Sequence, residues 1–295
     1  MTQLDLFADI VDEPEPIPAT FTAAPGRKRT APSPSHPKPA HPTPSQPARP
    51  GRGLRRWPHT LAMEIGEAVA ATWHKQHGGT AIEAPIGVVA ALSLVRQKDP
   101  SGPDLKTQIL SLDGPQLIGM LREIWSLHWM HRPDLIDRAR ILHEWLNSDV
   151  DDHRMYAVRA VAKMALERGL LDLTAHEDPF DRSTTDVLSP VMMCLRSRGA
   201  QQGLGEFHTP ASVADAMAYS VFVEAVNSYD TLKGAKGGEH IYDPACGSGG
   251  LLRSAAQNLR EQGLDPADFQ WSMCDVDEIA AACAAVNAII WVVSA

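Results

Sequence analysis

The residues best suited to bind a small ligand lie between positions 240 and 252. An apolar pair, Ile241 and Tyr242, is followed by Asp243 and then by a turn of small residues that contains Gly247 and Gly249. A helical pattern begins immediately after this turn. Glycine adopts positive φ without steric cost and lets the backbone approach a ligand closely. The order of strand, glycine turn and helix therefore predicts a cradle for a nucleotide-like ligand.

The acid at the end of the predicted strand indicates the charge of that ligand. Gly247 and Gly249 fit the first two positions of the dinucleotide fingerprint G-x-G-x-x-G, but Leu252 stands where the third glycine belongs. Asp243 precedes the first glycine by four residues, and its carboxylate would repel a pyrophosphate. The same carboxylate would attract an ammonium or sulfonium group, so the pattern favours a cationic ligand.

A second acid follows at a suitable spacing. Residues 271–274 form another mainly apolar run, which ends at Asp275 and is followed by a helical pattern from about Glu278. An acid at the tip of the second strand of such a unit accepts hydrogen bonds from ribose hydroxyls. Asp243 and Asp275 are 32 residues apart, which leaves room for a strand, a helix and a return strand.

An upstream stretch, residues 205–210, reads Gly-Glu-Phe-His-Thr-Pro. Thr209 is a good helix cap, and Pro210 suits the first turn of a helix, where its missing N–H costs nothing. Val213, Met217 and Val221 continue that helix along one face. Taken alone, the stretch predicts only a capped helix.

Together these stretches resemble the adenine-N6 DNA methyltransferases, especially the methylation subunits of type I restriction-modification systems. Asp-Pro-Ala-Cys-Gly-Ser-Gly-Gly from Asp243 is similar to the first cofactor motif of that family. Gly-Glu-Phe-His-Thr-Pro is similar to its upstream motif, which usually has Tyr where this chain has His208. The resemblance is specific over residues 180–295, where three motifs agree in order and spacing, and only general over residues 57–180.

The resemblance implies S-adenosyl-L-methionine as cofactor and a role for each matching residue. Asp243 would hold the amino group of the methionine part, and Asp275 would bind the ribose hydroxyls. Phe207 and Thr209 would close over the methionine from the other side, and Val276 would pack on the adenine. The residues that would wrap the methionine with backbone are Pro244, Ala245, Cys246, Gly247 and Gly249.

No catalytic residue is assigned, because the family's tetrapeptide Asn/Asp-Pro-Pro-Tyr/Phe does not occur in this sequence. Its polar residue binds the exocyclic amine, and its aromatic ring stacks on a flipped-out base. The chain is therefore expected to be truncated before this motif and to carry the cofactor-binding half of an enzyme. A decayed gene, a split subunit and a fragment stay open, as does a non-catalytic DNA- or clamp-interaction protein. A methyltransferase of protein glutamine is disfavoured by the upstream motif.

The expected fold class is α/β, in which a helical domain at residues 57–200 precedes the first part of a Rossmann-like methyltransferase domain at residues 201–295. Apolar residues at helical spacing, such as Leu117, Leu121 and Ile124, support some five or six helices in the first domain. His128 and His131 could seat a metal on one of these helices. They have no evident carboxylate or cysteine partner nearby, so a structural role is favoured and no metal is expected.

Residues 1–56 are expected to be a disordered tail, because they contain twelve of the thirteen prolines that run from Pro14 to Pro58. Residues 1–25 carry a net charge of −5 and residues 26–56 carry +8. Because the whole chain carries −9, residues 57–295 carry −12. The basic stretch is either a DNA-contacting segment or a solvated linker. Gln3 to Phe7 resemble the peptide by which bacterial proteins dock on the DNA sliding clamp, and an accidental match is the alternative.

The remaining signals concern the location of the protein in the cell. Acids follow Met1, so no signal peptide is expected. The four cysteines have neither a metal-ligand spacing nor a disulfide pattern, which favours reduced thiols in the cytoplasm. Residues 279–295 are apolar but too short for a membrane span of roughly 20 residues. A helix leading into a buried strand at residues 289–293 is expected instead. The expected partners are DNA and a specificity or restriction subunit.

Overall fold

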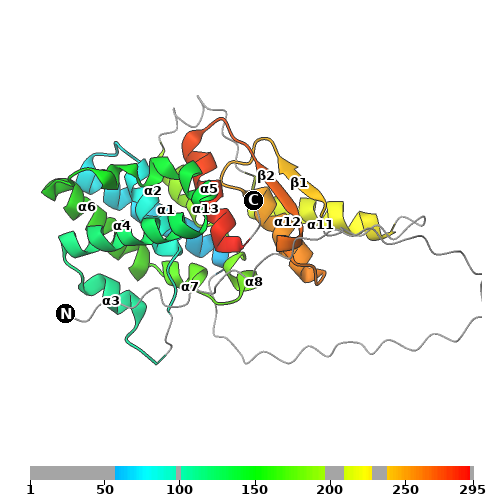
Figure 1. Ribbon diagram of the computed structural model, residues 1–295, viewed down its shortest axis with the longest axis horizontal. Helices are drawn as coiled ribbons and strands as arrows, with labels where there is room; N and C mark the ends of the chain where they lie inside the picture. The colour runs from blue at the N-terminus through cyan, green and yellow to red at the C-terminus, as the bar shows by residue number, and fades with distance from the viewer. Residues whose placement is uncertain (1–56, 98–100, 197–208, 228–237, 293–295) are drawn as a thin grey trace, which may run out of the picture. The chain divides into compact units, whose positions relative to one another are not determined.

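The computed structural model describes residues 57–97, 101–196, 209–227 and 238–292. These described residues fall within one compact unit. They are mostly helical and include one small parallel sheet (Figure 1). The tail, with the clamp-like peptide and the basic stretch, lies outside the described residues, and so does Phe207.

The first part of the described chain consists of helices, as the apolar periodicity predicted. They are α1 (Pro58–His77), α2 (Glu83–Ser93), α3 (Leu105–Ser111), α4 (Gly114–His131), α5 (Pro133–Arg138), α6 (Asp152–Glu167) and α7 (Leu170–Thr174), with the 3-10 turns η1 (Arg140–Leu142) and η2 (Glu144–Asn147).

Local signals explain where several of these helices begin and end. Asp113 and Gln116 form a capping box at the start of α4, in which each side chain accepts a hydrogen bond from the backbone of the other residue. Asp151 caps α6 by accepting the backbone N–H of Arg154 at 2.9 Å. Gly169, with φ of 97°, follows α6 in the left-handed region that favours glycine.

Helix α2 lies in the core of the helical part. Every residue from Ala84 to Ser93 is buried, and α2 contacts α4, α6, α7 and α9. A helix that is apolar all round needs such surroundings to be stable. Trp73 of α1 is also fully buried and donates its indole N–H to the carbonyl oxygen of Thr80 at 2.8 Å.

The second part alternates helices with two short strands. Its elements are α8 (Pro179–Arg182), α9 (Leu188–Leu195), α11 (Ala211–Asn227), β1 (His240–Asp243), α12 (Gly250–Glu261), η3 (Pro266–Asp268), β2 (Gln270–Met273) and α13 (Glu278–Trp291). Strands β1 and β2 pair in parallel, with His240 opposite Gln270 and Asp243 opposite Met273. The connection between two parallel strands runs through α12, which packs against β1 (Figure 1).

The strand predicted at residues 289–293 is wrong where the structure describes it, because α13 continues to Trp291. Two arginines explain this by binding carbonyl groups of the last turn. Arg182 donates to the oxygen of Ile290 at 3.0 Å, and Arg260 donates to the oxygen of Trp291. Helix α13 also packs on α2, α5, α8 and α9, which buries its apolar surface within the helical part. None of the helices in the described chain is long and apolar enough to cross a membrane.

Candidate functional site

The parallel register brings the two predicted acids to the same edge of the sheet. Asp243 ends β1, and Asp275 lies two residues after the end of β2. The N–H of Cys274 donates to the carbonyl oxygen of Asp243 at 3.0 Å, which continues the strand pairing past β2. Ligands of open α/β sheets bind at the carboxyl ends of the strands, so both acids lie at the edge where a ligand is expected.

The turn between β1 and α12 needs its glycines. Gly247 has φ of 55° and Gly249 has φ of 92°, both in the left-handed region. The N–H of Gly249 donates to the carbonyl oxygen of Cys246 at 2.8 Å, which closes the turn. Helix α12 begins at the next residue, Gly250, with Gly249 as its cap. We call residues 244–249 the glycine loop.

Asp275 is joined directly to the glycine loop. Its Oδ2 atom accepts the N–H of Gly247 at 2.7 Å, and its Oδ1 atom accepts the N–H of Asp277 at 2.9 Å. The N–H of Cys246 donates to the carbonyl oxygen of Cys274 at 2.9 Å. The bonds from Gly247 and Cys246 each connect residues 28 positions apart in the sequence, and they fix the glycine loop against the segment that follows β2.

Asp243 has one carboxylate oxygen bonded and one without a partner. Its side chain is buried, at 9% exposure, and Oδ1 accepts the N–H of Ala245 at 3.0 Å. Among the described residues, Oδ2 is buried and has no hydrogen-bond partner. A buried acceptor without a donor costs about 1–3 kcal/mol, and more when it is charged. This oxygen therefore suits a ligand that brings a donor, and an ammonium group is the strongest kind.

The thiol of Cys246 is suited to packing and not to nucleophilic chemistry. Cys246 is buried, and burial, together with the neighbouring Asp275 and Asp243, raises the pKa of its thiol to about 12. A thiol is a nucleophile only as the thiolate. The glycine loop can therefore hold a ligand through backbone groups and shape, without a covalent step.

The structure brings together six of the ten predicted site residues and places others at the surface. The six, all within one bonded arrangement, are Asp243, Ala245, Cys246, Gly247, Gly249 and Asp275. Pro244 is in the same loop and exposed, as is Ala245, and Val276 is 95% exposed. Thr209 is exposed two residues before α11, and Phe207 lies outside the described residues.

Helix α11, which follows Thr209, packs on α12, the helix of the glycine loop. The buried face of α11 carries Ala214 and Ala218, whereas Val213 and Met217 are 45% and 49% exposed. Val213 and Met217 thus lie on the outer side of α11, because close packing of the two helices favours the small alanines on the inner side.

Sequence reasoning did not single out four polar residues that support the loop. They are Asp186, Ser248, Arg253 and Asn287, which are hydrogen-bonded to one another or to the same segment. Arg253 gives a visible signal, since a charged residue interrupts the buried face of α12 between Leu252 and Ala256. No cluster of three or more His, Cys, Asp or Glu side chains that could hold a metal ion occurs within residues 57–97, 101–196, 209–227 and 238–292.

A strand, a glycine loop, a helix and a second parallel strand, with Asp243 at the end of the first strand and Asp275 shortly after the second, form one α/β unit. Residues 191–294 match the family model described as N-6 DNA Methylase, so this segment belongs to the adenine-N6 DNA methyltransferase family. The match confirms the resemblance drawn from the motifs and supports a DNA methyltransferase function. No curated protein matches the chain.

Proposed function

We propose that this chain is the cofactor-binding half of an S-adenosyl-L-methionine-dependent DNA methyltransferase that methylates adenine at N6, in a restriction-modification system. The observation that carries the proposal is the partnerless buried Oδ2 atom of Asp243, at the end of β1 in a segment of the N-6 DNA methylase family. In this proposal, β1, α12 and β2 are the first unit of a Rossmann-like domain at residues 201–295, which follows a helical domain at residues 57–200.

The residues of the site fit the proposed cofactor. Asp243 would accept a hydrogen bond from the ammonium group of the methionine part, and this group would supply the donor that Oδ2 lacks. Phe207 and Thr209 would cover the methionine, and Val276 would contact the adenine. The backbone that would enclose the methionine comes from Pro244, Ala245, Cys246, Gly247 and Gly249. When bound, the cofactor would supply an activated methyl group on its sulfonium sulfur.

Asp275 retains the capacity to bind ribose although it already holds the loop. Each of its two carboxylate oxygens accepts one backbone N–H, from Gly247 and from Asp277. A carboxylate oxygen can accept two hydrogen bonds, so one site on each oxygen remains for a ribose hydroxyl. Asp275 would then hold the loop and the ligand at the same time.

The residues that bind the target adenine are proposed to lie outside these motifs. Adenine-N6 chemistry needs a flipped-out base and a polar acceptor for its amine, and the tetrapeptide that provides them is not in the sequence. Because residues 57–295 carry −12, the basic stretch at residues 26–56 is the proposed DNA-contacting segment. We also propose two protein partners, a specificity or restriction subunit and the sliding clamp, which would bind residues 3–7. The proposed location is the cytoplasm.

Calorimetric titration of the full chain with S-adenosylmethionine tests the proposal. We expect Asp243→Ala to weaken binding by tenfold to a hundredfold, because hydrogen bonds to charged groups contribute about 1.5–3 kcal/mol. Asp265→Ala is a matched control, since Asp265 also accepts the N–H two residues ahead, at 2.9 Å, and is exposed in the turn before β2. Unchanged binding in Asp243→Ala, or no binding by the wild-type chain, would refute the proposal.

A further inference from the structure

We propose that Asp186, from the segment between α8 and α9, is a positioning residue that holds the glycine loop in its ligand-binding shape. The inference rests on the proposed function and extends it to a residue outside the family-matched segment, which begins at residue 191. It identifies the helical part of the chain as a support of the cofactor site.

The carboxylate of Asp186 accepts four hydrogen bonds from three different elements. The hydroxyl of Ser248, in the glycine loop, donates to Oδ2 at 2.5 Å. The side-chain amide of Asn287, in α13, donates to Oδ1 at 2.9 Å. The backbone N–H groups of Leu188 and Ser189 donate to the same oxygen at 2.9 and 3.1 Å, which caps the start of α9. One side chain thus joins α9, α13 and the loop.

Ser248 is held at two points, and this fixes the loop between its left-handed glycines. Besides its hydroxyl bond to Asp186, its carbonyl oxygen accepts the amide of Asn287 at 2.9 Å. Ser248 and Asn287 are both buried, with exposures of 3% and 2%. Since Ser248 lies between Gly247 and Gly249, these two bonds restrict the rotation of the peptide groups that form the turn.

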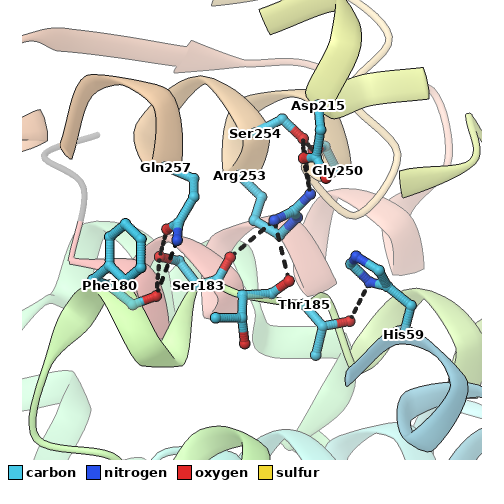
Figure 2. A network of polar contacts seen from close by, with 10 residues as sticks. His59, Phe180, Ser183, Thr185, Asp215, Gly250, Arg253, Ser254 and Gln257 are labelled. Carbon is cyan, nitrogen blue, oxygen red and sulfur yellow. Dashed lines mark hydrogen bonds and ion pairs between the residues drawn. The ribbon is translucent and has the colours of Figure 1, made fainter. Parts of the chain in front are cut away.

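The segment before Asp186 is fastened to α12 by a second set of contacts, shown in Figure 2. Arg253 of α12, which is 3% exposed, donates to the carbonyl oxygens of Ser183 at 3.0 Å and Thr184 at 3.3 Å. Its other terminal nitrogen pairs with Asp215 of α11 at 2.5 Å. On the opposite side, the hydroxyl of Thr185 lies 2.7 Å from Nδ1 of His59, at the start of α1 (Figure 2). Residues 183–186 therefore bridge α1 and the helix of the glycine loop.

The helix-capping bonds of Asp186 do not by themselves account for its environment. A cap needs one acceptor for backbone N–H groups, and Asp151 provides that for α6 from an exposed position. Burial around the carboxyl raises the pKa of Asp186. Placing a carboxylate in such surroundings is costly unless several donors compensate. Two of the four donors are the hydroxyl of Ser248 and the amide of Asn287, and that amide also binds the carbonyl oxygen of Ser248. Half of the hydrogen bonds to Asp186 therefore connect it to the glycine loop, and the other half cap α9.

The test uses the full chain and two measurements. The first is the dissociation constant for S-adenosylmethionine, and the second is the rate at which iodoacetamide alkylates Cys246, followed by mass spectrometry of peptides. Cys246 lies in the glycine loop, buried and with a raised thiol pKa, so its alkylation reports opening of the loop. In Asp186→Ala we expect binding at least tenfold weaker and alkylation of Cys246 at least tenfold faster.

Two variants separate positioning from general stability. Asp151→Ala removes a capping carboxylate of the same type far from the loop in sequence, and should match the wild type in both measurements. In Asp186→Asn, the dissociation constant and the alkylation rate should both stay within threefold of the wild-type values. The amide oxygen keeps the three contacts of Oδ1, and the NH₂ group can donate to the hydroxyl oxygen of Ser248. This rescue by a near-isosteric side chain is not expected of a residue that serves only through its charge.

The possible results discriminate between the two proposals. A folded Asp186→Ala that matches the wild type in both measurements would overturn the positioning role. If Asp186→Ala does not fold, Ser248→Ala takes its place: alkylation at least threefold faster supports the role, and an unchanged rate overturns it. Faster alkylation in a chain whose wild type binds no S-adenosylmethionine would support positioning of the loop and refute the proposed function.

Discussion

Two adjacent glycines at the end of the glycine loop should respond in opposite ways to substitution by alanine. Gly249 has φ of 92°, and a Cβ atom there would lie 3.2 Å from Cζ3 of Trp291. Gly250 is the first residue of α12, does not have positive φ, and has no atom within 4 Å of such a Cβ. The two positions differ in backbone conformation and in space, although they are neighbours in the sequence.

The magnitudes follow from these two differences. An L-residue in the left-handed region costs about 1–2 kcal/mol, and the crowding against Trp291 adds to this because the indole ring is buried. We expect Gly249→Ala to lower the free energy of unfolding by about 2–3 kcal/mol. Gly250→Ala should raise it by about 0.5 kcal/mol, since alanine restricts the unfolded chain and has the higher helix propensity.

Urea unfolding followed by circular dichroism of the full chain measures both values. Gly247→Ala is a third member of the series, because Gly247 has φ of 55° but no atom within 4 Å of an added Cβ. It should cost about 1–2 kcal/mol, which isolates the backbone contribution. A Gly249→Ala variant as stable as the wild type, or a Gly250→Ala variant destabilised as much as Gly249→Ala, would contradict these expected values.

Two further predictions concern charged side chains. Burial is the main cause that lowers the pKa of His128 from 6.5 to about 4. Between these pH values the unfolded chain therefore binds more protons than the folded chain. The free energy of unfolding should fall by at most about 3 kcal/mol as the pH decreases from 6.5 to 4. His128→Gln should lack this dependence, so the difference between the unfolding free energies of the wild type and the variant should fall over the same pH range, and an identical pH profile in the variant would contradict the prediction. Arg253→Met should cost about 3 kcal/mol in urea unfolding, because it leaves the carbonyl oxygens of Ser183 and Thr184 without the donor from Arg253 and removes the ion pair with Asp215. Arg140→Ala, which removes an exposed pair with Asp137, should cost less than about 1 kcal/mol, and equal losses in the two arginine variants would contradict the assignment.

The parts of the site that the sequence predicted are those determined by neighbouring residues. The glycine loop is short, its positive φ values require glycine, and the acid before it is buried at the end of an apolar strand. The pairing of Asp243 with the segment around Asp275 followed from the spacing of one strand, one helix and a parallel return strand. Each step needed only chain connectivity and local preference, which sequence patterns record well.

The parts that the sequence did not predict depend on packing between distant segments. Residues 289–291 have the apolar, β-branched character of a strand, but Arg182 and Arg260 bind the carbonyl groups that end α13. The inner face of α11 follows from its contact with α12, where alanines allow close approach. The contacts behind the proposed role of Asp186 could not be inferred from the sequence, because its partners Ser248 and Asn287 lie 62 and 101 residues away.

The same long-range contacts show that residues outside the family-matched segment also contact the glycine loop. The family match begins at residue 191, yet residues 183–186 provide acceptors to Ser248, Arg253 and Asn287. Helix α13 lies within the matched segment, but it packs mainly on α5, η1, α8 and α2, which precede that segment in the sequence. A family motif can therefore contain the residues proposed to face the ligand, while residues outside the motif make the hydrogen bonds that hold the loop in place. For this chain, the buried polar contacts between the glycine loop and residues 183–186 are the physical link between the helical part and the proposed methyl-donor site.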